Sequence, residues 1–183
     1  MSHRIILFRG MNTGGIRAPV AEQRAMATDM GLANPRTLLA SGNLVVESDQ
    51  APGALEAALE AETGRRFGRR IETIVRTPEQ WATLVAANPF PEQAKAAPAR
   101  LLAMIMKAGI KPGALEALRA FATGDERVEA AGDTLFFWHP DGIGASKMAA
   151  RAQPRLIGVG TGRKCNTVLK LADMVGLTGR QTK

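Results

Sequence analysis

The spacing of apolar and polar residues in the first 76 positions predicts alternating short strands and amphipathic helices. Short apolar runs beside glycine or asparagine are typical of strands, and apolar residues three or four positions apart are typical of helices. The predicted elements are a strand at 3–9, a helix from 19 to 31, a hairpin of strands at 36–40 and 44–47, a helix from 55 to about 64–68, and a strand at 71–75. This is the order of the split βαβ, or ferredoxin-like, fold, in which two helices back one four-stranded antiparallel sheet.

A similar order of elements begins again in the second half of the chain. Thr77-Pro78-Glu79-Gln80 predicts a helix start, with Thr77 as N-cap and Gln80 placed to reach back to it. This helix ends at 88–91, and the polar, alanine-rich residues 92–100 are expected to form a linker. The remaining predicted elements are a strand at 101–106, a helix at 112–121, strands at 127–131 and 134–138, a helix at 143–152, a short strand ending at 163–167, and a helix that ends at Gly176.

The two patterns together predict an α+β protein of two ferredoxin-like subdomains with antiparallel sheets. The expected boundaries are 1–76 for the N-terminal subdomain, 77–97 for a connecting helix and linker, and 98–183 for the C-terminal subdomain.

Composition is typical of a folded, basic protein. The chain has 183 residues, of which 45% are hydrophobic, with 24 lysines and arginines against 17 acidic residues and a net charge of +7. This composition excludes a disordered chain, and the longest apolar stretch, 101–106, is far shorter than the ~20 residues that span a membrane. A single cysteine, Cys165, excludes an intramolecular disulfide, and no signal-peptide pattern is visible, so we expect a cytoplasmic protein without a membrane partner.

The basic excess is concentrated in residues 140–183, which contain eight basic and two acidic side chains. A local positive field raises the encounter rate with anions such as phosphates or nucleic acids. A solvated basic tail has the same composition, and both interpretations stay open.

The first candidate site follows the first predicted strand. Its residues supply a cation, an amide and glycines that allow close approach of a ligand to backbone N–H groups: Arg9, Asn12, Gly14 and Gly15. In a ferredoxin-like fold the turn Ser41-Gly42-Asn43 lies at the same end of the sheet, so we expect it near this loop. The alternative is that both segments are ordinary tight turns.

Two further candidates lie in the C-terminal half. Asp141, Gly142, Gly144, Ser146 and Lys147 have the chemistry of an anion-binding turn before a helix, although the order of residues differs from a Walker A loop. The alternative is a helix cap formed by Asp141 or Ser146.

The third candidate is the segment that contains Arg163, Asn166 and Thr167. Asn166 or Thr167 is expected to cap the last helix and to leave Arg163 beside its positive end.

Other reactive residues give little support for catalysis. His3 and His139 belong to no cluster with metal-ligand spacing, and Cys165 has no evident base to activate it, so we expect neither a metal nor a cofactor. The aromatic strand 135–138 lacks the glycine and basic positions of RNA-recognition modules, and we expect it to be buried on both faces.

Six motifs in fixed order make the whole chain resemble a bacterial family called domain of unknown function sixteen ninety-seven. They are FRGMNTGG at 8–15, SGN at 41–43, RT at 76–77, NPFP at 88–91, PDGIGASK at 140–147 and RKCNTVLKL at 163–171. The resemblance implies a cytoplasmic protein of ferredoxin-like subdomains with no assigned activity. Cys165 departs from the family, which commonly has an aromatic residue there, and Met11 and Thr13 replace branched aliphatic residues. The first departure argues against Cys165 as a nucleophile.

The leading functional hypothesis is a binding protein for a phosphate-bearing ligand, either nucleotide-like or a nucleic acid. Arg9, Lys147 and Arg163 would pair with the anion, and Asn12, Asn43 and Asn166 would orient it. One alternative is an enzyme that acts on a small phosphorylated or acyl substrate, with Asp141 as general base and Ser146 as nucleophile. The other is a protein-interaction module in which the motifs only shape turns. The sequence leaves both catalysis and oligomeric state open.

Overall fold

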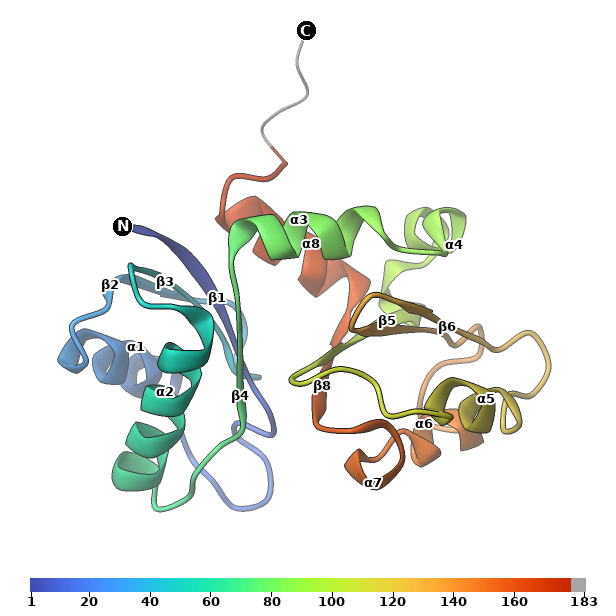
Figure 1. Ribbon diagram of the computed structural model, residues 1–183, viewed down its shortest axis with the longest axis horizontal. Helices are drawn as coiled ribbons and strands as arrows, with labels where there is room; N and C mark the ends of the chain where they lie inside the picture. Colours follow the sequence, from blue (N-terminus) through green and yellow to red (C-terminus); the bar gives the residue numbers. More distant parts are fainter. Residues whose placement is uncertain (179–183) are drawn as a thin grey trace, which may run out of the picture. The chain divides into compact units, whose positions relative to one another are not determined.

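The computed structural model describes residues 1–178, and the chain divides into two compact units. The first unit contains Met1–Ala82 together with the described residues from Leu171 onwards, and the second contains Thr83–Lys170. Each unit has one four-stranded antiparallel sheet (Figure 1). The predicted α+β class with two ferredoxin-like sheets is therefore confirmed.

The first unit has the strand order β2-β3-β1-β4, which is the order of the ferredoxin-like fold. Its elements are β1 (Ser2–Phe8), α1 (Val20–Asp29), β2 (Ala33–Thr37), β3 (Asn43–Ser48), α2 (Pro52–Phe67) and β4 (Thr73–Arg76). Helices α1 and α2 lie on the same side of this sheet (Figure 1). Alternate residues of the strands, such as Ile6, Leu44 and Val75, meet Met26 and Leu59 of the helices in one apolar core.

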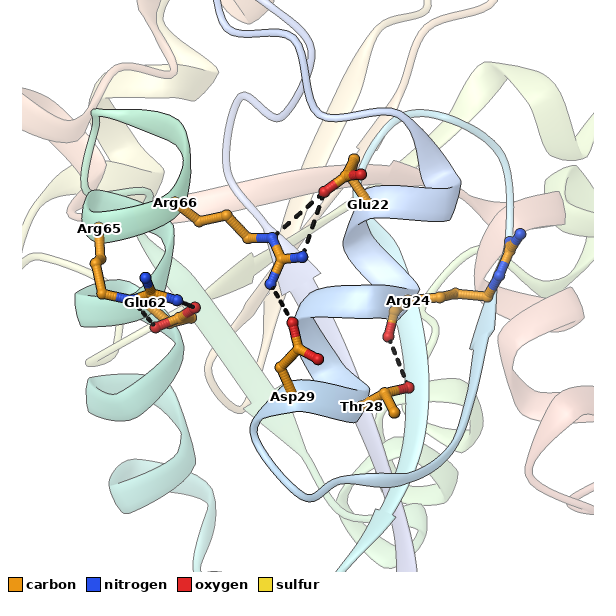
Figure 2. Close-up of polar contacts among 7 residues, drawn as sticks. All are labelled: Glu22, Arg24, Thr28, Asp29, Glu62, Arg65 and Arg66. Atoms are coloured by element: carbon orange, nitrogen blue, oxygen red, sulfur yellow. Dashed lines mark hydrogen bonds and ion pairs between the residues drawn. The ribbon is translucent and has the colours of Figure 1, made fainter.

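One arginine side chain, that of Arg66, joins the two helices at the surface. Arg66 of α2 forms ion pairs with Glu22 and Asp29, which lie at opposite ends of α1 (Figure 2). Arg65 pairs instead with Glu62 of its own helix. Helices α1 and α2 are therefore held together by their shared apolar core and by the two ion pairs of Arg66 at the surface.

Helix α2 also supplies hydrogen-bond acceptors to the edge strand β4. The backbone N–H of Thr73 donates to Glu60 at 3.1 Å, and that of Val75 donates to Glu56 at 2.9 Å. Glu60 is almost completely buried. These carboxylates satisfy N–H groups that an edge strand would otherwise present to another chain.

The second unit repeats the topology with the strand order β6-β7-β5-β8. In chain order, the strands of this sheet and the helices between them are β5 (Leu101–Met106), α5 (Ala114–Arg119), β6 (Arg127–Ala131), β7 (Thr134–Trp138), α6 (Lys147–Arg151), α7 (Pro154–Ile157) and β8 (Gly160–Lys164). Met106, Leu135 and Phe137 belong to the core on one face of this sheet, together with Leu118 of α5 and Met148 of α6.

Three further helices precede or follow this sheet: α3 (Pro78–Ala86), α4 (Pro91–Ala96) and α8 (Cys165–Met174), with a short 3-10 helix, η1 (Pro98–Arg100), before β5. The predicted capping box of α3 is present, because Thr77 N–H donates to Gln80 Oε1 at 2.9 Å and Gln80 N–H donates to Thr77 Oγ1 at 3.2 Å. No helix among residues 1–178 has the length and apolar content needed to cross a membrane.

Several predicted elements were wrong in position or type. Residues 92–100 form α4 and η1 instead of a linker, because Pro91 sets the first helical turn and the alanines favour helix. Strand β2 begins before the predicted 36–40 and ends at Thr37, since Leu39 has φ +61° in the turn that follows. The helix predicted at 143–152 is reduced to α6, and α7 was not predicted.

Strand β8 ends at Lys164, within the range predicted for its end, and its glycines permit close packing against β5. A Cβ atom at Gly160 would lie 2.7 Å from Met106 Sδ, and one at Gly162 would lie 3.2 Å from a methyl carbon of Leu102. The apolar alternation that identifies a strand is therefore missing from this segment. The aromatic strand β7 is buried on both faces over Leu135–Phe137, as predicted.

Candidate functional site

The glycine-rich loop after β1 is held in shape by Asn12. Its Nδ2 donates to the carbonyl oxygens of Ala18, at 2.9 Å, and Ala40, at 2.6 Å, while its Oδ1 accepts from Ala18 N–H at 2.7 Å. Asn12 itself has φ +60°, a conformation that asparagine tolerates better than most side chains. The amide therefore fixes both ends of the loop and ties it to the segment before β3.

The turn that contains Ser41, Gly42 and Asn43 lies beside this loop, as predicted. Phe8 N–H donates to the Gly42 carbonyl oxygen at 2.9 Å, and a Cβ atom at Gly42 would lie 2.8 Å from Met11 Cβ. Asn43 is buried, and its Nδ2 donates to the Leu38 carbonyl and to Ser41 Oγ. The two amides, Asn12 and Asn43, thus stabilise turns of their own chain.

Of the candidate residues in these loops, Arg9, Asn12, Gly14, Gly15 and Ser41 are exposed, and so is a further cation, Arg17. Arg9 continues from β1, and its backbone N–H donates to the Glu72 carbonyl oxygen at 2.8 Å. Neither 9–18 nor 38–43 contains an acidic residue. The exposed part of the two loops therefore offers glycines that a ligand can approach closely, the hydroxyl of Ser41 and the positive charge of Arg9.

Arg69 is a member of this surface that the sequence interpretation missed. Its Nη1 lies 3.4 Å from the position a Cβ atom would take at Gly14. Arg65, Arg66 and Arg70 all form ion pairs, whereas Arg69 has none with any residue in the described part of the chain. The basic run 65–70 was the available signal, but only the fold shows which of its four arginines is left unpaired.

The second candidate segment, 141–147, is mainly a turn and a helix cap. Gly142 has φ +87° and its N–H donates to the His139 carbonyl oxygen, while Ser146 Oγ accepts from Ala149 N–H at 3.0 Å as the N-cap of α6. Asp141 and Lys147 are exposed, as is Gly144. Within the described chain, no hydrogen bond joins Asp141 to Ser146.

Ser146 also hydrogen-bonds to a buried carboxylate. Its hydroxyl contacts Glu126, and His139 Nδ1 lies 3.3 Å from Glu126 Oε1. The His139 ring stacks on Phe137 with centroids 5.8 Å apart. Ser146 is buried, its oxygen already accepts the capping hydrogen bond, and the lowered pKa of the Glu126 carboxylate makes that group a weak base toward the hydroxyl. The enzyme alternative therefore gains no support from this arrangement.

Arg163 lies on the other face of the second sheet from α6. It pairs in register with Ala103 of β5, whereas Leu102 and Met106 face the core that contains α6. Its Nη1 donates to Thr161 Oγ1 at 2.6 Å and to the Gly162 carbonyl at 2.9 Å. Burial lowers the pKa of the guanidinium to about 10. The fold therefore keeps Lys147 and Arg163 on separate faces of the sheet.

The start of the last helix differs from the prediction. Helix α8 begins at Cys165, before Asn166 and Thr167, so these two residues lie in its first turn and do not precede it. Asn166 Oδ1 accepts from Thr167 N–H at 3.0 Å. Cys165 is buried, and burial raises the pKa of its thiol, which disfavours the reactive thiolate.

The second unit also contains a small apolar cavity of about 60 Å³ on the face of the sheet that carries Ala103. Leu84, Phe136, Cys165 and Val168 are among the residues that line it. Among residues 1–178, no group of three or more histidine, cysteine or acidic residues could hold a metal ion.

Comparison with known proteins agrees with this fold. The solved structure of the conserved bacterial protein SP0830 from Streptococcus pneumoniae is similar to this chain, with a TM-score of 0.74 and 21% sequence identity. The likeness covers 95% of this chain and 98% of that one, and at this identity it shows the fold alone. No curated protein matches the sequence. A family model described as protein of unknown function (DUF1697) matches residues 1–136, and the chain belongs to this family.

Proposed function

We propose that this protein binds a small phosphate-bearing ligand at the exposed loop surface of its first unit. The observation that carries the proposal is the guanidinium of Arg69, which lies beside Gly14 and has no ion pair among residues 1–178. The two loops next to it contain no acidic residue. An unpaired arginine keeps its donors available for a phosphate, which it can bind through two parallel hydrogen bonds.

The rigidity of the loop supports the same proposal. Asn12 fixes the loop through three hydrogen bonds, so little conformational entropy is lost when a ligand binds. Gly14 and Gly15 are exposed and have φ of +61° and +88°, which leaves the backbone open to close approach. Arg9 supplies a second cation in the same loop.

The experiment is a titration of the full chain with inorganic phosphate, pyrophosphate and mononucleotides, followed by calorimetry and thermal unfolding. A bound ligand stabilises the fold by about 2.7 kcal/mol at a hundredfold excess over Kd. We expect Arg69→Ala to weaken binding about tenfold or more, because each hydrogen bond to a charged group contributes about 1.5–3 kcal/mol.

Arg127→Ala is the matched control. Arg127 is also exposed and without an ion pair in the described chain, but it lies on β6 of the second unit. The Arg127→Ala substitution removes the same charge as Arg69→Ala and should leave ligand binding unchanged. Equal binding by wild type, Arg69→Ala and Arg127→Ala, or no binding of any of these anions, would rule the proposal out.

A further inference from the structure

The second unit has a groove that the candidate motifs do not include. It has a volume of about 570 Å³, and its lining residues lie on or next to α5, α6 and α7. These three helices lie close together (Figure 1). Two arginines, a glutamine and four apolar residues line the groove, and none of the lining residues is acidic. This volume is in the range of pockets that hold small ligands.

One wall of the groove is a stacked cation and ring. The guanidinium carbon of Arg151 lies 4.4 Å from the centroid of the Phe121 ring. Phe121 is half-buried, whereas Arg151 is exposed. Stacking on the ring holds the guanidinium plane in place, so the groove presents a flat, positively charged surface.

Further cations lie next to this surface. Arg155 lines the groove, is exposed and forms no ion pair within residues 1–178, and Lys111 Nζ donates to its carbonyl oxygen at 3.2 Å. Nearby, Glu116 and Glu129 are both bound to Arg119, which reduces their effect on the groove. The groove therefore favours an anion.

Arg151 and Arg155 belong to the basic segment 140–183, of which Arg180 and Lys183 lie outside the described residues. Arg151 lies on α6 and Arg155 lies on α7, so these two charges of the basic segment have defined positions in the fold. The interpretation as a uniformly solvated tail does not account for the stacking of Arg151 on Phe121.

The flat surface distinguishes between classes of anionic partner. An acidic peptide needs only the charges of the arginines, whereas a nucleobase also uses a guanidinium or aromatic plane for stacking. Gln153 lines the same groove and carries both a donor and an acceptor for the edge of a base. We propose that this groove binds one nucleotide of a single-stranded nucleic acid, with its base stacked on Arg151 and its phosphate paired with Arg155.

The test measures the fluorescence anisotropy of a short, labelled oligothymidylate with the full chain over a range of salt concentrations. We expect Arg151→Ala to weaken binding about tenfold, since stacking of one base has that order of effect. Arg155→Ala should weaken binding and reduce the slope of log K against log salt by about 0.7, the value for one phosphate contact in single strands.

Two controls separate stacking from charge. Arg151→Lys keeps the positive charge and removes the guanidinium plane, so it should bind more weakly than wild type with an unchanged salt slope. Arg127→Ala removes an exposed arginine outside the groove and should bind like wild type. Circular dichroism verifies folding, and Arg151→Gln with Arg155→Gln provides a second pair of variants if either alanine variant is unfolded.

Three results would overturn the inference. The first is the absence of oligothymidylate binding at low salt, and the second is wild-type affinity in both groove variants. The third is displacement of the oligonucleotide by polyglutamate or inorganic polyphosphate as effectively as by unlabelled oligonucleotide, which would show that charge alone is recognised. The inference does not rest on the phosphate site of the first unit. Arg69→Ala should keep oligonucleotide binding, and loss of binding in that variant alone would favour the loop site and reject the groove.

Discussion

His139 Nδ1 lies 3.3 Å from Glu126 Oε1, and the two side chains are only 2% and 9% exposed. The same carboxylate accepts hydrogen bonds from Thr123 N–H, at 3.0 Å, and from the hydroxyl of Ser146. Glu126 therefore connects the loop after α5, the end of β7 and the N-cap of α6. This arrangement stabilises the fold around Ser146, and the lowered pKa makes Glu126 a weak base toward its hydroxyl.

Glu126→Gln should make this stabilisation visible through its pH dependence. Burial of Glu126 raises its pKa, but hydrogen bonds from Ser146, Thr123 and His139 outweigh burial and hold the pKa below its ordinary value. A lowered pKa in the folded state means that the carboxylate stabilises the fold above its unfolded-state pKa, and that this contribution is lost as the pH falls through the folded-state pKa.

We expect Glu126→Gln to lower the free energy of unfolding by about 1–3 kcal/mol near neutral pH. The difference from wild type should shrink in acid, below about pH 4. Urea unfolding of both proteins across this range provides the measurement. A difference that stays constant with pH would contradict the assigned role of the carboxylate.

Gly42→Ala should destabilise the first unit by more than Gly31→Ala. Both glycines have positive φ, +84° and +76°, so alanine is strained at either position by about 1–2 kcal/mol. Only at Gly42 would the new Cβ also meet other atoms, at 2.8 Å from Met11 Cβ and 3.0 Å from Phe8 Cβ. Overpacking adds about 1–3 kcal/mol, measured by chemical unfolding. Equal decreases in the free energy of unfolding for the two variants would show that the surroundings of Gly42 relax to accommodate the extra methyl group.

Two substitutions at Asn12 distinguish the effect of backbone strain on stability from the effect of the side-chain hydrogen bonds. Asn12→Gly keeps a residue that tolerates φ +60° but loses the hydrogen bonds to Ala18 and Ala40, whereas Asn12→Ala loses the bonds and adds strain. We expect Asn12→Ala to be less stable than Asn12→Gly by about 1 kcal/mol. Both should be less stable than wild type in thermal unfolding. An Asn12→Gly variant as stable as wild type would show that the side chain does not hold the loop.

The Cys165 thiol should react slowly in the folded protein. Burial limits access to the sulfur and raises its pKa, and both effects reduce the reactive thiolate. With an aromatic disulfide reagent at mildly alkaline pH, we expect the native protein to react about tenfold or more slowly than the urea-unfolded protein. Similar rates would indicate that the start of α8 opens readily.

Much of the architecture could be predicted from the sequence because local patterns carried it. The short apolar runs of β1 and β3, the helical spacing of α1 and α2, and the capping box at Thr77 all depend on residues near one another in the chain. The first residues of β8 could not be predicted, because Gly160 and Gly162 are selected by side chains of β5 more than fifty residues earlier.

The candidate sites divide in the same way. The order of strands and helices was enough to predict that the loop after β1 and the Ser41-Gly42-Asn43 turn lie at one end of a sheet, because that order specifies the topology. The sequence could not separate ligand-binding groups from structural ones, since an amide such as Asn12 has the same identity whether it faces a ligand or its own backbone. The fold was needed to show that Arg69 lies beside Gly14 without an ion pair among residues 1–178, and that Arg151 stacks on Phe121. The physical reason is that hydrogen bonds and ion pairs form between neighbours in space, and the fold alone determines which side chains are neighbours.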